Sequence, residues 1–264
     1  MFPGFYVFDK FISSYALCVL AGAAVSVPIA IRRYKRRGGD DISMIFVFLF
    51  AAIGAFFGMH LLYGITNLEH WGILLKAESL ADFAGRFATL FGGSVFYGGL
   101  LGGALAGGIS IRVQKLPAGL TADCIAPSAA LFHAFGRVGC FLVGCCYGVE
   151  WEHGITFTES LVESANGVPR LPVQLIEVGL ELVLFAVLSA LLHKNKLHGG
   201  LFAVYLASYS VGRFVIEFWR GDDYRGFFLG LSTSQIVSVL VLVGAVVFLV
   251  LRRRGNRRGT AESV

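Results

Sequence analysis

The stretch GRVGCFLVGCCYG, residues 136–148, places one arginine and three cysteines in a segment that is otherwise apolar. Long apolar runs on both sides of it along the chain are typical of membrane-spanning segments. An ionisable side chain inside a bilayer is costly unless it faces the interior of a helix bundle or a water-filled cavity. The stretch therefore indicates a polar site within a membrane protein.

The composition supports this interpretation. The chain has 264 residues, of which 56% are hydrophobic and 15% are charged, and it contains 24 Phe and 34 Gly. A soluble domain is usually about 45–50% apolar, and glycine is commoner in membrane helices than in soluble ones. Five cysteines, three of them within seven residues, do not form the pattern of a secreted disulfide framework. The chain is thus predicted to be a polytopic helical membrane protein.

A membrane-spanning helix needs about 20 mostly apolar residues, and seven segments meet this requirement. They are residues 11–31, 43–63, 91–111, 120–147, 173–192, 199–219 and 231–251. We therefore expect an all-α fold, with a single seven-helix transmembrane domain over residues 1–251. A basic cytoplasmic tail, residues 252–264, is expected to follow it and to be disordered.

Lys and Arg residues are distributed unevenly between the two sides of these spans. With the N-terminus outside, 14 of the 22 lie in inside segments and 6 in outside segments, while Arg137 and Arg213 lie within spans. Because cytoplasmic loops are enriched in Lys and Arg, the N-terminus is predicted outside and the C-terminus inside. Only Lys10 precedes the first span, which favours a retained helix over a cleaved signal. The basic clusters are then cytoplasmic loops, and no nucleic acid is expected as a partner.

Polar residues recur at helical spacing in the fourth, fifth and sixth spans. The three stripes are His133, Arg137 and Cys140; Arg170, Gln174, Glu177 and Glu181; and Tyr209, Arg213, Glu217 and Arg220. Residues three or four apart share one helix face, so the stripes are expected to face one another across a polar cavity. The stripes contain more arginines than acidic residues that could pair with them. A guanidinium can donate two parallel hydrogen bonds to a phosphate group. The cavity is thus predicted to bind a phospholipid head group; the alternative is structural pairing of Glu217 with Arg213 and of Glu177 with Arg137.

Two further segments have informative patterns. The third span is rich in glycine, which lets helix backbones approach closely, so packing explains most of these glycines but not the Tyr97 among them. The glycines are Gly92, Gly93, Gly98, Gly99, Gly102, Gly103, Gly107 and Gly108. The outside loop over residues 64–90 has an amphipathic pattern and is predicted to lie in the membrane interface.

Six motifs follow one another along the chain in an order typical of one family. They are SSYALCVLAG (13–22), FYGGLLGG (96–103), GRVGCFLVGCCYG (136–148), LPVQLIE (171–177), YSVGRFVIEFWRGDD (209–223) and LSTSQIVSVLVL (231–242). With them the chain resembles the bacterial prolipoprotein diacylglyceryl transferase family over nearly its whole length. The resemblance implies transfer of the diacylglyceryl group of phosphatidylglycerol to the thiol of a lipobox cysteine, with release of glycerol phosphate. It implies a multi-pass enzyme of the bacterial cytoplasmic (inner) membrane, whose partners are an anionic phospholipid, a precursor lipoprotein signal peptide and the bilayer.

The resemblance also implies roles for individual residues. Arg137 and Arg213 match the family's essential arginines, and Tyr97 takes the place of its histidine, so these three are predicted to be catalytic. The residues predicted to bind substrate are Tyr15, Gly98, Gly99, Cys140, Gln174, Glu177, Glu217 and Arg220. The arginines are expected to stabilise charge on the leaving group. Candidates for the base that activates the acceptor thiol are Tyr97, His133 and His60, and no cofactor is expected.

The sequence departs from the family pattern near these residues. Cys140 and Val143 stand where the family has asparagines, Cys145 stands where it has an acidic residue, and an arginine common in the second span is absent from residues 53–60. The chain is therefore expected to be a divergent member. Two other functions remain open: an enzyme of the same fold that acts on another lipid or acceptor with help from the cysteines, and a non-catalytic phospholipid-binding or transport protein.

The clustered cysteines have four interpretations: packing, a disulfide in an oxidising compartment, a metal site and a covalent nucleophile. The C-x4-C-C spacing is not a zinc pattern, and a continuous helix would place Cys140 and Cys146 on opposite faces. Cys140 shares the face of Arg137, but the family's residue there is an amide, which cannot be a nucleophile. We therefore expect direct attack by the acceptor thiol, with Cys140 lining the head-group pocket and no metal bound.

Overall fold

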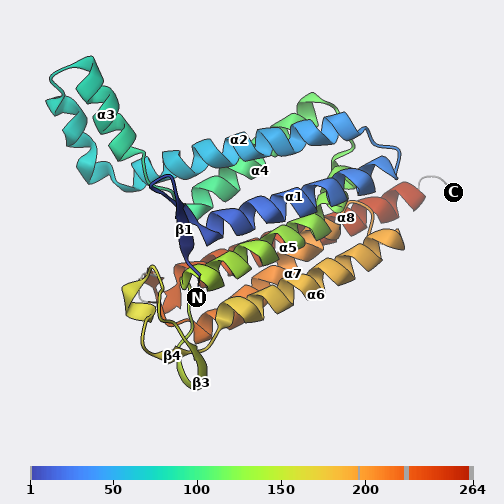
Figure 1. Ribbon diagram of the computed structural model, residues 1–264. Helices are drawn as coiled ribbons and strands as arrows, with labels where there is room; N and C mark the ends of the chain where they lie inside the picture. Colours follow the sequence, from blue (N-terminus) through green and yellow to red (C-terminus); the bar gives the residue numbers. More distant parts are fainter. Residues whose placement is uncertain (1, 196, 223–225, 262–264) are drawn as a thin grey trace. The chain divides into compact units, whose positions relative to one another are not determined.

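The computed structural model describes residues 2–195, 197–222 and 226–261 of the chain. Within these residues, seven helices are long and apolar enough to span a membrane (Figure 1). They are α1 (Ser14–Lys35), α2 (Asp41–Thr66), α4 (Phe96–Val113), α5 (Ala118–Val143), α6 (Val173–His193), α7 (Leu201–Ile216) with the following 3-10 turn η3 (Glu217–Trp219), and α8 (Thr233–Ala261). The predicted number of spans is confirmed.

Several of these helices have ends that differ from the predicted spans, among them α4 and α8. The third span was expected to begin at residue 91, but α4 begins at Phe96. The Nδ1 atom of His60 lies 2.9 Å from the carbonyl oxygen of Phe91 and 2.8 Å from that of Gly93, which holds the preceding residues as a loop. Helix α8 continues to Ala261. The expectation of a disordered tail is thus wrong over residues 252–261, while residues 262–264 lie outside the described residues.

Among the described residues, three short antiparallel ladders accompany the helices, so this part of the chain is mostly helical rather than all-α. They pair β1 (Gly4–Val7) with β2 (Lys10–Ser13), β3 (Glu150–Thr156) with β4 (Pro169–Arg170), and β5 (Phe227–Phe228) with β6 (Leu231–Ser232). Phe8 and Asp9 have positive φ values of 45° and 62° and form the tight turn between β1 and β2. The first apolar run therefore begins as a strand and becomes helical only at Ser14.

The chain divides into two compact units. One unit is Tyr34–Thr121, which holds α2, α4 and the segment between them, and the other unit holds the remaining helices. The expectation of a single domain over residues 1–251 stays a prediction.

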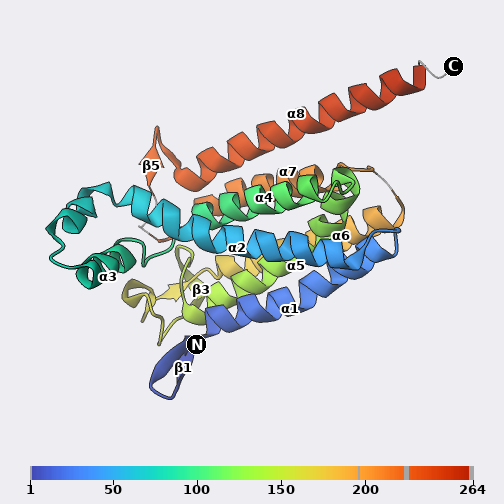
Figure 2. The ribbon, with the colours of Figure 1, turned by 90° about the horizontal axis from the view of Figure 1, so that it is seen from above.

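Within the unit Tyr34–Thr121, α2 and α4 lie side by side (Figures 1 and 2). A Cβ atom at Gly54 would collide with the carbonyl oxygen of Gly102, and one at Gly58 would collide with that of Gly98. On each helix the two glycines are four residues apart, which is the small-residue spacing that lets membrane helices approach closely. The predicted packing role of the glycines in the third span is confirmed for this pair of positions.

The segment between α2 and α4 is helical and forms an arm beyond the end of α2 (Figure 1). It consists of the 3-10 helix η1 (Leu68–Lys76) and the helix α3 (Leu80–Leu90). The hydroxyl of Ser79 accepts the N–H of Asp82 at 3.1 Å and so caps α3. Two leucines of this arm, Leu75 and Leu80, are strongly exposed. Its location in the membrane interface stays a prediction.

The core of the other unit is formed by α5, α6 and α7. Its most buried members are Ala126, Ala130, Leu188 and Leu201. The carboxylate of Asp123 on α5 accepts the backbone N–H of Leu201 at 2.8 Å and that of Gly199, so it caps the start of α7. This cap fixes the registry between α5 and α7, and α7 in turn packs against α8.

Candidate active site

The three polar stripes meet at Glu177, a carboxylate on α6 that is 1% exposed. One oxygen pairs with Nε of Arg137 on α5, and the other lies 3.1 Å from Nη1 of Arg213 on α7. The Nη2 atom of Arg213 lies 2.6 Å from the carboxylate of Glu217 and donates to the hydroxyl of Ser234 on α8 at 3.2 Å. One carboxylate thus joins three helices, and the structural ion pairs considered from the sequence are both present.

The other two arginines of the stripes have partners of their own. Arg220 binds the carboxylate of Asp222 through Nε, at 2.8 Å, and also through Nη2. The guanidinium of Arg170 lies 4.4 Å from the ring centroid of Tyr147, and its Nη2 donates to the carbonyl oxygen of Ser164 at 2.9 Å. The surplus of arginines counted from the sequence is therefore smaller than expected. The stripes do face one another, but Arg137 and Arg213 reach Glu177 directly where a cavity was expected.

Arg137 nevertheless keeps an unused donor. Its Nε is bound to Glu177 and its Nη1 donates to Sγ of Cys140 at 3.6 Å, while Nη2 is buried and has no hydrogen-bond partner among the described residues. The Oε1 atom of Gln174 is buried and unbonded in the same way. Leaving a buried polar group unpaired costs about 1–3 kcal/mol, and more for a charged group. An anion bound at Nη2 would remove that cost.

A second polar contact lies one helical turn further along α6. The Nδ1 atom of His133 lies 2.7 Å from the carboxylate of Glu181, which is fully buried, and its ring centroid lies 4.8 Å from that of Tyr209. The predicted alignment of these residues is confirmed. As a candidate base, His133 would have to exchange its contact with Glu181, whereas His60 is occupied by the two carbonyl oxygens at the start of α4.

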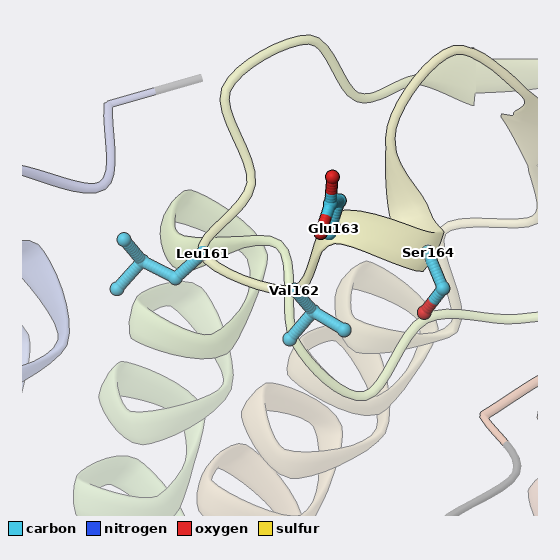
Figure 3. A pocket seen from close by; sticks show the side chains of 4 residues that line it. All are labelled: Leu161, Val162, Glu163 and Ser164. Atoms are coloured by element: carbon cyan, nitrogen blue, oxygen red, sulfur yellow. The ribbon is translucent and has the colours of Figure 1, made fainter.

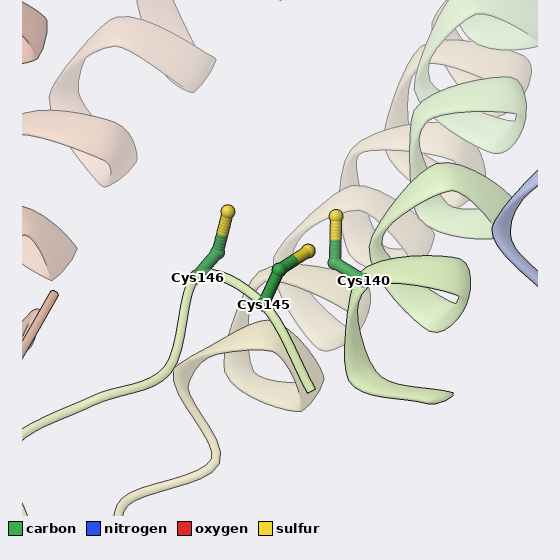
Figure 4. A group of neighbouring side chains, drawn as sticks. All are labelled: Cys140, Cys145 and Cys146. Atoms are coloured by element: carbon green, nitrogen blue, oxygen red, sulfur yellow. The ribbon is translucent and has the colours of Figure 1, made fainter. Parts of the chain in front are cut away.

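The cysteine-rich segment is not a continuation of α5. The helix ends at Val143 instead of residue 147, because Gly144 and Cys146 adopt positive φ values of 79° and 57°. The expectation that Cys140 and Cys146 lie on opposite faces is therefore wrong. The Sγ atoms of Cys140, Cys145 and Cys146 lie within 4.8 Å of one another and point to the same side of the loop (Figure 4).

The pKa values of Cys145 and Cys146 in this loop are shifted in opposite directions. Hydrogen bonds from Cys140 and Cys145 lower the pKa of the Cys146 thiol, and the guanidiniums of Arg220 and Arg137 lower it further against the effect of burial. Hydrogen bonds with Cys140 and Cys146, together with burial, raise the pKa of Cys145.

Helix α1 brings Tyr15 to the same region. A Cβ atom at Gly139 would lie 3.0 Å from the Cα of Tyr15, so the missing side chain at Gly139 allows α1 and α5 to approach closely. The tyrosine interacts electrostatically with Arg137 and with the three cysteines. From α6, the amide of Gln174 donates to the carbonyl oxygen of Cys145 at 2.8 Å. Of the predicted site residues, this unit therefore brings Tyr15, Arg137, Cys140, Gln174, Glu177, Arg213, Glu217 and Arg220 into one region.

The remaining predicted site residues belong to the unit Tyr34–Thr121. Tyr97 lies in the first turn of α4, where its ring centroid is 5.9 Å from that of Phe96. Gly98 and Gly99 are buried against α2, which gives both of them a packing role. The catalytic role of Tyr97 and the substrate contacts of the two glycines stay predictions.

The polar loop between α5 and α6 carries a separate feature. Leu161, Val162, Glu163 and Ser164 line a surface pocket of about 540 Å³ (Figure 3). Its one charged lining residue is acidic, so this pocket does not suit an anionic head group. The loop is instead fastened through Ser164, whose hydroxyl lies 2.8 Å from that of Tyr147.

Comparison with known proteins shows the family of this chain. The sequence profile described as prolipoprotein diacylglyceryl transferase matches residues 5–251. The chain is 32% identical to the phosphatidylglycerol–prolipoprotein diacylglyceryl transferase 2 of Clostridium perfringens, over 97% of each protein. It is 32% identical to the corresponding enzyme of Clostridium tetani, over 95% of this chain and 97% of the relative. It is 31% identical to that of Streptococcus uberis, over 91% and 90%. This chain therefore belongs to the prolipoprotein diacylglyceryl transferase family.

Proposed function

We propose that this protein transfers the diacylglyceryl group of phosphatidylglycerol to the thiol of a lipobox cysteine in a precursor lipoprotein. Membership of the family supports the reaction class. The observation that carries the assignment to this region is the buried Nη2 of Arg137, a charged donor without a protein partner among the described residues. The donor phosphate is the group that it would bind.

The ion pairs prepare Arg137 and Arg213 for this role. Both guanidiniums are bound to opposite oxygens of Glu177, so their orientation is set before a ligand arrives. In a low-dielectric site, donors that are already oriented stabilise developing charge without reorganising during the reaction. The guanidinium of Arg137 holds Glu177 through Nε and still presents Nη2 to a phosphate, which the single nitrogen of a lysine cannot do.

The reaction then needs one displacement. The acceptor sulfur forms a bond to the terminal glyceryl carbon, the bond between that carbon and the phosphate oxygen breaks, and glycerol phosphate departs with the electron pair. Charge accumulates on the departing phosphate, which is where Arg137 and Arg213 act. The thiol proton can pass to the released phosphate monoester, whose second pKa is about 6.

We further propose an orientation of the chain in which this chemistry lies on the outer side. The excess of Lys and Arg in alternate loops supports an outside N-terminus and a cytoplasmic C-terminus. In this orientation α5 runs outward, and Arg137, near its end, lies in the outer half of the membrane. A secreted precursor presents its lipobox there, so we propose the bacterial cytoplasmic membrane as the location and the precursor signal peptide as the acceptor.

A transfer assay with purified protein tests this function. The protein is placed in vesicles that contain phosphatidylglycerol with labelled acyl chains, and a lipobox peptide is added. We expect label on the peptide and release of one glycerol phosphate per modified peptide, and no label on a peptide whose cysteine is replaced by serine. Lipid that binds to the protein without transfer would identify a phospholipid-binding protein and contradict the proposal.

A further inference from the structure

The three clustered thiols form a preorganised group. The backbone N–H groups of Gly144 and Cys145 both donate to the carbonyl oxygen of Cys140, at 3.0 and 3.1 Å, and so reverse the chain immediately after α5. Cys146 keeps a left-handed conformation, with φ of 57°, which costs a non-glycine residue about 1–3 kcal/mol. The amide of Gln174 holds the loop from α6. These constraints bring Cys145 and Cys146 back to Cys140 (Figure 4).

The spacing of the sulfur atoms suits a metal cation. The three Sγ atoms lie within 4.8 Å of one another. In a tetrahedral site with Zn–S bonds of about 2.3 Å, sulfur atoms are roughly 3.8 Å apart, so a contraction of about 1 Å or less would bring the three sulfur atoms to that spacing. Thiolate ligands select soft cations such as Zn²⁺ and Cu⁺. The sequence spacing gave no indication of this, because it does not reveal where α5 ends.

Two guanidiniums lie close to the three sulfur atoms. The guanidiniums of Arg137 and Arg220 both interact electrostatically with Cys146, and Nη1 of Arg137 donates to Sγ of Cys140. Neighbouring cationic side chains stabilise thiolates. Three thiolates around one divalent cation carry one net negative charge, which these guanidiniums would balance.

We propose that Cys140, Cys145 and Cys146 bind one thiophilic cation of the Zn²⁺ class, and that the anionic metal–thiolate group excludes the donor phosphate from Arg137. The second part rests on the proposed function, because it takes Arg137 as the phosphate ligand. Each thiol loses its proton when it coordinates the cation, and no redox step is involved. The site is therefore inhibitory, and its ligands are distinct from the groups that stabilise the leaving phosphate.

Cadmium binding tests the site directly. Full-length protein, kept reduced with a phosphine, is titrated with Cd²⁺, and the ultraviolet charge-transfer absorption of Cd–thiolate bonds is recorded. We expect one equivalent to bind, with absorption in proportion to three Cd–S bonds, and Zn²⁺ to displace it in competition. Cys140→Ser, Cys145→Ser and Cys146→Ser should each weaken binding at least about tenfold, because loss of a single outer-shell partner already has an effect of that size. Cys18→Ser, outside the group, should leave binding unchanged.

Three results would overturn the site. The first is absence of the Cd–thiolate absorption, and the second is a Cys18→Ser variant that loses Cd²⁺ binding as strongly as the three cluster variants do. The third is a disulfide between two of the three cysteines in protein purified under air, if that protein still binds no Cd²⁺ after the disulfide has been reduced. Because all three readouts are independent of turnover, they stand whether or not the transfer reaction is found.

The competition is tested separately by phospholipid binding. Binding of phosphatidylglycerol is measured with and without one equivalent of Zn²⁺, and then after a chelator is added. We expect Zn²⁺ to weaken lipid binding at least about tenfold in wild-type protein, reversibly, and to have no effect in the Cys145→Ser variant. Lipid binding that is unchanged by bound Zn²⁺ would contradict the inhibitory role, while a protein that binds metal but transfers no lipid would contradict only the proposed function.

Discussion

Two helix contacts of this molecule are built on opposite principles. Helices α2 and α4, in one unit, meet through Gly54, Gly58, Gly98 and Gly102, whose missing side chains let carbonyl oxygens approach the facing backbone. Helices α5, α6 and α7, in the other unit, meet through Arg137, Glu177 and Arg213. None of these three charged side chains is more than 11% exposed. Both contacts fix neighbouring membrane helices, but only the second one removes charges from water.

The difference shows where function resides. Close glycine packing needs no further explanation, because it satisfies the backbone and gains van der Waals contact. Burying charges has a desolvation cost that an ion pair often does not recover, and apolar side chains of similar size are frequently at least as stable. The ionic contact also leaves Nη2 of Arg137 unpaired. A contact that costs more than its apolar replacement, and keeps an unused donor, is best explained by a ligand.

Removing the shared carboxylate should have the largest effect. Glu177→Gln keeps the shape of the side chain but leaves two buried guanidiniums without their common counter-charge, and breaking a buried ion pair costs about 3–5 kcal/mol. The free energy of unfolding, measured by denaturant titration in mixed micelles, should fall by about that amount. The matched change Glu69→Gln, at an exposed position, should alter it by less than about 0.5 kcal/mol. Equal stability of the two variants would mean that Glu177 does not hold the helices.

An alanine in the glycine contact should have a smaller effect. The Cβ atom of Gly102→Ala would collide with the carbonyl oxygen of Gly54, and inserting such a group into a packed contact costs about 1–3 kcal/mol. Gly108→Ala lies on the same helix, where a Cβ atom meets nothing within 4 Å. It should leave stability unchanged or raise it by up to about 1 kcal/mol, because alanine is the better helix former. The same unfolding assay applies, and a destabilising Gly108→Ala would show that the contact is not specific.

The smallest effect is expected at Cys140. A serine hydroxyl retains the contact with Arg137, so Cys140→Ser should keep transfer within about twofold of wild type in chelated buffer. Intact-protein mass spectrometry of wild-type protein given donor lipid alone should show no diacylglyceryl adduct. Loss of transfer together with a donor-dependent adduct at Cys140 would make this thiol a covalent nucleophile instead.

Helical periodicity was sufficient to predict the polar stripes and the seven spans. Residues four apart must share a face, so the alignment of Arg137 with His133 and of Arg213 with Glu217 follows from spacing alone. The bridge that Glu177 makes to both arginines could not be predicted in this way. Spacing within one helix does not determine how neighbouring helices are rotated about their axes. Asp222 was missed as the partner of Arg220, although its position two residues further on was a usable signal.

The cysteine group shows the limit of such arguments most clearly. Its geometry depends on the end of α5, and a positive φ at Cys146 has no signature in an apolar sequence. Asp123 illustrates the converse case. Asp123 is a carboxylate in an apolar span, and such a residue is compatible with a cap for the N-terminus of another helix. The later span begins with Gly199 and Gly200, but nothing in the sequence showed that Asp123 caps this helix.

Transfer by an Arg137→Lys variant tests the central role of this guanidinium most directly. Lysine keeps the positive charge beside Glu177, but its single nitrogen cannot pair with Glu177 as Nε does and also replace the unpaired Nη2. With phosphatidylglycerol vesicles and a lipobox peptide, kcat/KM should fall at least about tenfold, equivalent to about 1.4 kcal/mol of transition-state stabilisation. Arg86→Lys, whose guanidinium pairs with Asp82 on α3, should transfer at the wild-type rate. Near-normal transfer by folded Arg137→Lys protein would contradict the assignment and leave Arg137 a structural residue.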